Sequence, residues 1–216
     1  MLKLKGLHSY SEEAVIDFEK LGESNLFGIF GPTGSGKSTI LDAITLALYG
    51  HVERLGKKGY HGLISDNCAE ASVEFTFSIG RGEEEQLFTI GRAYIKERDR
   101  GAEEMPAVKF KRGSLRSLKG KEHTILANKT DDMTRNIEEI IGLSFDDFTR
   151  AVVLPQGRFA EFLKLKGGER IKMLERIFSL QQYGEALNKR LGEEKNRIET
   201  ALESLTGKQS GLNITR

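Results

Sequence analysis

The sequence is poor in the features that would place a protein outside the cell or in a membrane. Its single cysteine, Cys68, has no partner for an internal disulfide, so we expect a protein of a reducing, cytoplasmic compartment. No apolar run approaches the roughly 18 residues of a membrane-spanning helix, and the N-terminus lacks the apolar core of a signal peptide. Charge of one sign is not in excess either: 33 Lys and Arg against 32 Asp and Glu leave a net charge of +1, so any attraction to nucleic acid must be local.

What is present is enough for a folded core, because 38% of the 216 residues are hydrophobic. The N-terminal half has the short apolar bursts and the alternation of strands. We expect strands at residues 2–7, 14–18, 26–30, 71–79, 86–95, 107–111 and 123–127, with a hairpin joining the fourth and fifth. The uniformly apolar segment 26–30 is typical of a strand buried on both faces, whereas the glycine-rich, basic segment 51–68 is expected to be a surface loop.

The second half is patterned as helix. Helices are expected at 130–141, where Thr130 is a suitable N-cap, at 145–150 and after Gly167, with a short apolar strand at 151–154. The last helix has a heptad seam, interrupted by Glu194, that consists of Leu187, Leu191, Ile198, Ala201 and Leu205. These patterns predict a lobe at 1–167, the base of a coiled coil at 168–206 and a flexible or truncated tail at 207–216.

The segment after the expected strand at 26–30 carries the strongest chemical signal. Its residues match G-x-x-x-x-G-K-[ST] at every fixed position: Gly31, Pro32, Thr33, Gly34, Ser35, Gly36, Lys37 and Ser38, followed by Thr39. Gly34 and Gly36 let backbone N–H groups converge on phosphate oxygens, and the next helix adds the partial positive charge of its N-terminus. Lys37 suits the β and γ phosphates, and the Ser38 hydroxyl suits Mg²⁺. A ligand-free turn would not require this Lys and Ser, so the motif predicts a site for ATP and Mg²⁺.

A complete set of hydrolytic residues is not evident. The two acidic pairs, Asp131-Asp132 and Asp146-Asp147, fall at the starts of expected helices, where they complement the helix dipole instead of ending an apolar strand. An NTPase also needs a carboxylate that orients the attacking water and an aspartate that supports the metal. The chain is therefore expected to bind nucleotide without carrying every residue that hydrolysis requires.

Together these features resemble the N-terminal half of the head of an SbcC-type ATPase, a DNA-repair relative of the SMC proteins and ABC ATPases. The resemblance rests on the N-terminal strand pair, on GPTGSGKSTILDAITLALYG at 31–50, on VLPQGRFAEFL at 153–163 and on the heptad helix. It implies an α/β fold, with a P-loop ABC-type ATPase lobe, an appended antiparallel β layer and a C-terminal coiled-coil helix. The family's signature loop, Asp-Glu strand and switch histidine are not found in this sequence, so the resemblance implies one lobe of a split head.

The resemblance also assigns roles to single residues. It implies that Gln156 is the Q-loop residue, whose amide oxygen ligates Mg²⁺ and senses the γ phosphate; a polar cap on the preceding strand is the alternative. His8 stands where relatives often have an arginine that touches phosphate, but a neutral imidazole is a poorer clamp, so a surface histidine in a turn is an equal alternative. Ser65, with Ile64 and Asp66, matches a segment that contacts the nucleoside in relatives. Catalytic roles are thus implied for Lys37 and Gln156.

A local excess of cations is a further signal. Six basic residues and no acid fall within 109–121: Lys109, Lys111, Arg112, Arg116, Lys119 and Lys121. They could neutralise DNA phosphates without reading bases, or they could form a solvated sheet edge that blocks aggregation. The resemblance implies DNA as a partner, together with the C-terminal half of the same protein, a second copy of the head and an SbcD-like metallophosphoesterase nuclease.

Other functions use the same phosphate loop. Another SMC-type chromosome-maintenance or recombination ATPase would share the heptad helix, whereas a transporter-type ABC ATPase would place a helical subdomain and a signature after Gln156. A small-molecule kinase would need acceptor-site and lid residues and no coiled coil. The heptad helix favours the DNA-repair ATPase, in which ATP-driven head dimerisation would gate nuclease processing of DNA ends and hairpins.

Overall fold

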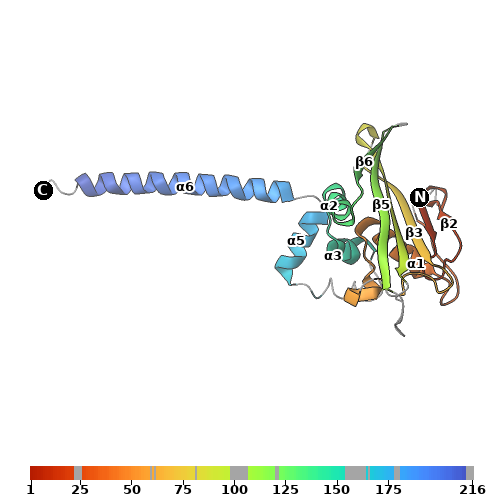
Figure 1. Cartoon of the computed structure of the whole chain (residues 1–216). Helices are drawn as coiled ribbons and strands as arrows, with labels where there is room; N and C mark the ends of the chain where they lie inside the picture. Colours follow the sequence, from red (N-terminus) through yellow and green to blue (C-terminus); the bar gives the residue numbers. More distant parts are fainter. Residues whose placement is uncertain are drawn as a thin grey trace. The chain divides into compact units, whose positions relative to one another are not determined.

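The chain forms two compact units, residues 1–161 and 162–216, each of which is described by itself (Figure 1). The computed structural model describes residues 1–21, 26–58, 60, 62–80, 82–97, 107–119, 122–153, 164, 166–177 and 181–212. Among these residues the helices and strands are mixed, as the sequence predicts for an α/β protein.

The first unit is built on a sheet of six strands in the order β2-β1-β3-β4-β5-β6, with every neighbouring pair antiparallel. The strands are β1 (Leu2–Lys5), β2 (Ala14–Ile16), β3 (Glu70–Ile79), β4 (Gln86–Glu97), β5 (Ala107–Lys119) and β6 (Glu122–Ala127). The hairpin of β3 and β4 is confirmed. The strand β5 is longer than expected, and a bulge interrupts its register with β4 opposite Ala93 and Tyr94.

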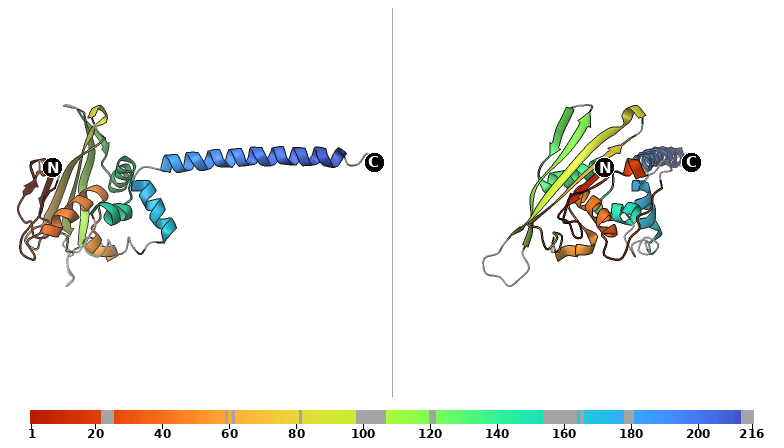
Figure 2. Two further views of the ribbon diagram at one scale, coloured as in Figure 1. Left: turned by 180° about the vertical axis from the view of Figure 1, so that it is seen from behind. Right: turned by 90° about the vertical axis from the view of Figure 1, so that its right-hand side faces the viewer.

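Two helices, α1 (Lys37–Tyr49) and α2 (Thr130–Ile141), cover one face of this sheet (Figure 2). Alternate residues of the central strands point to that face, because successive strand side chains project to opposite sides. The largest fully buried apolar side chains of the core are Tyr94, Leu2, Leu4, Leu7, Leu46, Leu48, Leu63, Ile90, Leu115, Met133 and Ile137. The opposite face keeps polar residues such as Lys3, Glu74 and Arg116, with side chains about one third to two fifths exposed.

The expected strand at 26–30 is wrong for this structure. These residues form no strand, and Leu26 and Phe30 are 81% and 92% exposed. Phe27 has a neighbour in Phe18, with ring centroids 5.6 Å apart. A strand that is buried on both faces needs neighbouring strands at its edges and a packed layer on each face of the sheet, and no described strand pairs with this segment. The predicted antiparallel layer exists, but the segment that leads into the phosphate loop is not part of it.

Other segments differ from expectation in smaller ways. The segment 51–68 is not a simple surface loop, because it holds the 3₁₀ helix η2 (Glu53–Lys58) and buries Val52, Leu63 and Ile64. The helix α3 (Phe145–Phe148) is capped by Ser144, whose hydroxyl accepts the backbone N–H of Asp147 at 3.3 Å. Residues 149–153, of which 151–153 were expected to be extended, form the π-helix η4 (Thr149–Val153). Two further 3₁₀ turns are η1 (Phe18–Leu21) and η3 (Gly82–Glu84).

Both acidic pairs lie in first helical turns, Asp131 and Asp132 in α2 and Asp146 and Asp147 in α3, as predicted. Thr130 is not the N-cap of α2, however. The helix begins one residue earlier than that role requires, with Lys129 at the N-cap position, and the Thr130 hydroxyl accepts a hydrogen bond from Arg92 instead. The Thr130 hydroxyl therefore accepts a hydrogen bond from a buried guanidinium and does not cap the helix, contrary to the prediction from the sequence pattern.

The second unit contains α5 (Gly167–Ile177) and α6 (Gln181–Leu212), which confirms the helical pattern after Gly167. The helix α6 continues past residue 206, where the sequence pattern weakens. Its apolar residues Leu191, Ile198 and Leu205 are each about 60% exposed. No helix among the described residues is long and apolar enough to cross a membrane.

The packing of α2 against the sheet gives a test of the fold. Ile137 is completely buried, so Ile137→Ala should reduce the free energy of unfolding by about 2–5 kcal/mol through lost burial and the cavity that remains. Glu139→Ala, on the exposed side of the same helix, is the matched control and should change it by less than about 0.5 kcal/mol. Urea denaturation measures both; equal effects of the two changes would contradict the placement of α2.

Candidate functional site

The glycine-rich segment 31–36 forms a bent loop that leads directly into α1. Gly34 and Gly36 have φ angles of 82° and 89°, a left-handed backbone conformation that residues other than glycine rarely adopt. Within the loop the Ser35 N–H donates to the Pro32 carbonyl at 3.3 Å, and the Thr39 N–H donates to the Gly36 carbonyl at 3.0 Å. Both glycines are therefore required by the backbone, and the first turn of α1 starts immediately after the loop.

Lys37 is folded back over this loop. Its ammonium group donates to the carbonyls of Gly31 and Pro32 at 2.8 and 2.6 Å, and it lies 3.4 Å from the Ser35 hydroxyl. An ammonium group has three N–H donors, so these three acceptors satisfy it. The charge of Lys37 thus lies within the curve of the loop, where an anion that enters would meet it.

A tight turn at residues 7–10 packs against the loop. Leu7 and Tyr10 exchange backbone hydrogen bonds of 3.0 and 2.8 Å, and the Ser9 hydroxyl donates to the Gly34 carbonyl at 3.1 Å. A Cβ atom on Gly36 would come within 2.7 Å of the Tyr10 ring. Gly36 is therefore needed for close packing as well as for its φ angle, and the turn supports the loop from one side.

His8 lies at the tip of this turn, with a φ angle of 45° that is unusual for a residue with a side chain. Burial, and secondly the charge of Arg54, lowers the pKa of His8 from 6.5 to about 4. Its buried Nε2 atom has no hydrogen-bond partner in the structure. The neutral imidazole is thus held beside the glycine-rich loop with an unpaired nitrogen, and His8 lies in a turn with intermediate exposure, so both interpretations of this residue remain open.

Ser65 lies on the other side of His8. It is 8% exposed, and its hydroxyl donates to the His8 carbonyl, while its N–H donates to the Gly6 carbonyl at 2.8 Å. The Lys96 ammonium group donates to the carbonyls of Ser65 and Asp66 at 2.7 and 3.1 Å. These bonds fix the Ser65 segment against the turn at His8, so the two predicted residues are brought together and the Ser65 hydroxyl is already engaged.

Sequence reasoning missed a cation beside the first turn of α1. Arg54 of η2 forms an ion pair with Asp42 at 2.5 Å and donates to the Thr39 hydroxyl at 3.3 Å. Burial raises the pKa of Asp42 to about 6, although the guanidinium acts in the opposite direction. Asp42 is the one acid in a mostly apolar helix, and this was the available signal. The pair fastens η2 to the helix that follows the phosphate loop.

The structure brings together most residues of the predicted nucleotide site. Pro32, Thr33, Gly34, Ser35 and Gly36 form the loop, and Lys37, Ser38 and Thr39 begin α1. Gln156 lies outside the described residues. The donor chemistry fits a Mg²⁺-bound phosphate chain, because the Lys37 ammonium group, the backbone N–H groups of the first turn of α1 and the exposed Ser38 side chain lie at one helix N-terminus.

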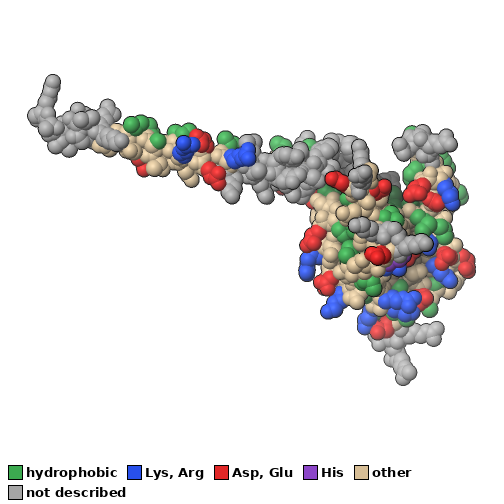
Figure 3. Space-filling model, turned by 90° about the horizontal axis from the view of Figure 1, so that it is seen from above, with side chains coloured by type: hydrophobic (Ala, Val, Ile, Leu, Met, Phe, Trp, Pro, Cys, Tyr) green, Lys and Arg blue, Asp and Glu red, His purple; other side chains and the backbone are tan. Residues whose placement is uncertain are grey.

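The basic residues at 109–119 lie on β5, and most of those described are paired with acids. Lys109 forms an ion pair with Glu97, Lys111 with Glu70 at 2.6 Å, and Arg116 with Glu74 at 3.3 Å. Basic and acidic side chains are accordingly intermixed on the face of the first unit shown in Figure 3. No described acid forms an ion pair with Arg112. The Lys119 side chain and Lys121 lie outside the described residues.

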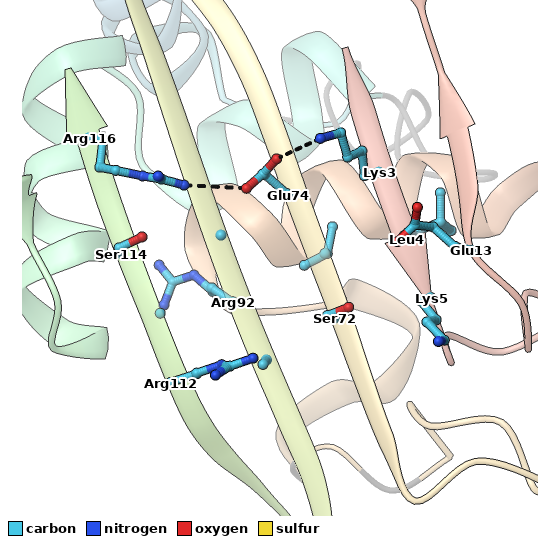
Figure 4. A pocket seen from close by; sticks show the side chains of 14 residues that line it. Lys3, Leu4, Lys5, Glu13, Ser72, Glu74, Arg92, Arg112, Ser114 and Arg116 are labelled. Atoms are coloured by element: carbon cyan, nitrogen blue, oxygen red, sulfur yellow. Dashed lines mark hydrogen bonds and ion pairs between the residues drawn. The ribbon is translucent and has the colours of Figure 1, made fainter. Parts of the chain in front are cut away.

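Arg112 and Arg116 border a hollow of about 500 Å³ on the polar face of the sheet, shown in Figure 4. Its floor is made of small residues, and Lys3 and Lys5 lie on the opposite side, with Glu74 bridging Lys3 and Arg116 at 3.3 Å each. The basic group that the sequence placed on one strand is therefore part of a wider, mixed-charge surface that crosses four strands.

The neutral state of His8 gives a test by pH. The unfolded chain binds a proton at His8 near pH 6.5, whereas the folded chain does so only near pH 4, so stability falls as the pH decreases through this window. Asparagine tolerates the positive φ of this position and does not titrate in this range. The free energy of unfolding of His8→Asn should therefore decrease less than that of the wild type between about pH 7 and pH 4.5. Asp42 acts with the opposite sign in both proteins and cancels in the difference. Urea unfolding at stepped pH checks this; the exposed His123→Asn is the control, and parallel curves for wild type and His8→Asn would refute it.

Known proteins are similar in sequence to this chain over most of its length. The profile of a family described as AAA domain matches residues 1–213. The SbcC component of nuclease SbcCD from Bacillus subtilis (strain 168) is 47% identical over 212 residues, which are 98% of this chain and 18% of that relative. The SbcC component from Clostridium acetobutylicum is 42% identical over 210 residues, 97% of this chain and 17% of that relative.

A probable DNA double-strand break repair Rad50 ATPase from Aquifex aeolicus (strain VF5) is 33% identical over 188 residues, covering 84% of this chain and 16% of the relative. The chain thus spans less than a fifth of the length of these three relatives. The matched residues include the glycine loop, the turn at His8 and the antiparallel sheet. The chain therefore belongs to the AAA domain family, with SbcC-type ATPases among its relatives.

Proposed function

We propose that this chain is the ATP-binding N-terminal half of the head of an SbcC-like ATPase. The observation that carries the proposal is the loop at 31–36, in which two left-handed glycines precede α1 and over which the ammonium group of Lys37, the first residue of α1, is folded back. Helix N-termini with converging N–H groups favour phosphate. The similarity to the SbcC component of nuclease SbcCD from Bacillus subtilis gives this phosphate site its biological setting.

The roles of the residues follow from their positions. Backbone N–H groups of the loop and of the first turn of α1 bind and orient the phosphate chain, Lys37 leaves its carbonyl acceptors to pair with the outer phosphates, and Ser38 offers its hydroxyl to the metal. ATP, when bound with Mg²⁺, supplies the phosphoanhydride bond whose charge these groups neutralise. Gln156 is proposed to supply its amide oxygen to the metal.

The exposure of segment 26–30 is evidence for the proposal that another part of the protein completes the head. Leu26 and Phe30 are almost fully exposed, and the segment precedes the loop that must be held rigidly. Strands of the C-terminal half would pair with the edges of this segment, other packed elements would cover its faces, and the same half would bring the catalytic carboxylates that this chain lacks. A second copy of the head would then close over the γ phosphate. By itself the chain should bind ATP weakly and hydrolyse it very slowly.

The helix α6 is proposed to be the base of the coiled coil. An isolated helix of this kind is marginal in water, and Leu191, Ile198 and Leu205 are exposed along it. The seam residues Ala201 and Leu187 belong to the same proposal, although the Leu187 side chain is outside the described set. The returning helix of the C-terminal half would pair with this seam, and an SbcD-like metallophosphoesterase would dock near its base. ATP-driven closure would then gate access of DNA ends and hairpins to the nuclease.

DNA is proposed to bind through the basic residues of β5. Because Lys109, Lys111 and Arg116 already pair with acids, they would have to exchange a carboxylate for a phosphate, so their contribution should be smaller than their number suggests. Arg112 forms no ion pair with a described acid, although its charge helps to lower the pKa of Glu70 after the larger effect of Lys111, and it lies beside the hollow of Figure 4. We therefore assign Arg112 the largest share of phosphate binding, with Lys119 and Lys121 as further candidates.

Removal of the Lys37 ammonium group tests the nucleotide site. Lys37→Ala should weaken binding of ATP with Mg²⁺ at least tenfold, or about 1.4 kcal/mol, since the outer phosphates lose their cation. Calorimetric titration measures the Kd. Lys20→Ala is the control, because Lys20 is exposed and pairs with Asp17. Unchanged affinity in Lys37→Ala would refute the site, and robust ATP turnover by the 216-residue wild-type chain alone would refute the split head.

The salt dependence of DNA binding tests the β5 surface. Each phosphate contact releases counterions, so Arg112→Glu should reduce the slope of log K against log salt by about one on duplex DNA, in a series from about 50 to 200 mM salt. Lys20→Glu changes the net charge equally and serves as the control for a general electrostatic effect. Fluorescence anisotropy provides the binding constants, and equal slopes for wild type and Arg112→Glu would remove Arg112 from the interface.

A further inference from the structure

The helix that begins at the phosphate loop is fastened at its other end with unusual completeness. The last four carbonyls of an α-helix have no partner within the helix. In α1, these are the carbonyls of residues 46–49. The Gly50 N–H donates to the Leu46 carbonyl at 2.9 Å, and the Thr134 hydroxyl of α2 lies 3.3 Å from the Tyr49 carbonyl, although its single proton can also go to the Thr130 carbonyl at 3.0 Å. The remaining two carbonyls accept from a single side chain of the sheet, that of Arg92.

Arg92 lies on β4 and is 2% exposed. Its Nε atom donates to the Ala47 carbonyl at 2.8 Å, and its Nη2 atom donates to the Leu48 carbonyl at 3.1 Å. The same guanidinium reaches α2, where it donates to the hydroxyls of Thr130 and Thr134 at 2.7 and 3.0 Å. One planar group thus joins the strand β4, the end of α1 and the start of α2.

The charge of Arg92 has no carboxylate partner in an ion pair among the described residues. A buried charge must be compensated, and here the compensation comes from two carbonyls at the negative end of the α1 dipole. An arginine is suited to this place, because its planar fork directs several N–H donors at fixed angles. The same dipole presents its positive end to the phosphate loop.

Gly50 shows that the fit around the guanidinium is close. Its φ angle is 69°, as in many helix C-caps, and a Cβ atom at this position would lie 3.0 Å from the Arg92 Nη1 atom. Glycine is therefore required at residue 50 both by the backbone conformation and by the space that Arg92 occupies.

From these contacts we infer that Arg92 is a positioning residue for the phosphate site: it fixes the axis of α1, and with it the loop at 31–36, from the end opposite to the nucleotide. The inference rests on the proposed ATP binding and adds to it a residue that does not touch the ligand. The helix α1 has 13 residues and is about 20 Å long, so Arg92 acts through the helix and not through its own field.

A small displacement at this end is expected to matter at the other. The N–H groups proposed to bind phosphate belong to the loop and to the first turn of the same helix. In enzymes, a misplacement of reacting groups by about 1 Å can lower the reaction rate as much as a hundredfold, so a shift of α1 should also weaken phosphate binding. If the last turn of α1 loses the two guanidinium bonds, the carbonyls of Ala47 and Leu48 must find other donors, and the helix can shift on the sheet.

The test compares ATP affinity with stability in matched variants of the chain. Arg92→Met removes the donors and should raise the Kd for ATP with Mg²⁺ about tenfold, whereas Arg92→Lys keeps a cation and should raise it about threefold. Phe88→Leu is the control: Phe88 lies four residues earlier on β4, is 4% exposed and stacks on Phe77, so its loss should destabilise the sheet without removing any hydrogen bond to α1. All Kd values are measured well below the lowest melting temperature, and Phe88→Leu should keep the wild-type Kd.

Wild-type affinity in both Arg92 variants, with a loss of melting temperature like that of Phe88→Leu, would overturn the inference and leave Arg92 a purely structural role. If Arg92→Met does not fold, Gly50→Ala replaces it, because the added methyl group crowds the guanidinium without removing it. If the wild type itself fails to bind ATP, the proposed function is refuted, and hydrogen exchange then decides the role of Arg92. Faster exchange at residues 38–41 in Arg92→Lys would support it, and faster exchange confined to residues 46–49 would overturn it.

Discussion

The two ends of α1 impose the constraint on which the rest of the first unit depends. A helix leaves unpaired N–H groups at its start and unpaired carbonyls at its end, and each set must be satisfied by something outside the helix. At the start, the glycine-rich loop leads directly into the first turn, and the proposed function assigns the N–H groups there to a phosphate. At the end, the sheet supplies Arg92, the second helix supplies Thr134, and Gly50 closes the turn. The sheet order and the position of α2 are therefore tied to the geometry of the loop.

The surroundings of the loop show how a site can be rigid on one side and open on another. The turn at His8 and the Ser65 segment are held by a network of backbone bonds, and Arg54 fastens η2 to Asp42 and Thr39. The segment before the loop has no such support, because its apolar residues face outward. The turn at His8, the Ser65 segment and η2 thus support one side of the loop within this unit, and the proposed function assigns the support of residues 26–30 to a separate part of the protein.

Local patterns in the sequence were sufficient for much of this architecture. Alternation predicted the β3–β4 hairpin, periodicity predicted α2 at its observed bounds, and the glycine-rich motif predicted the loop that leads into α1. The failures concern contacts between distant residues. The burial of residues 26–30 depends on neighbours that an apolar run cannot name, and the acids that pair with Lys109, Lys111 and Arg116 come from β3 and β4. Arg92 could have been noticed as the one charged residue at an inward position between Ile90 and Tyr94, but its carbonyl partners are 44 or 45 residues away.

The outward-facing segment at residues 26–30 also bears on how the molecule behaves in concentrated solution. Five consecutive uncharged residues, three of them large and β-prone, make a strip that other copies of the chain can adhere to. The strip is short, and Glu23 and Pro32 stand close to its two ends. A charge and a proline so placed hinder the stacking of identical segments into a growing ribbon. The segment can therefore stay exposed and apolar for binding to a specific partner, while the flanking charge and proline limit self-aggregation of the chain.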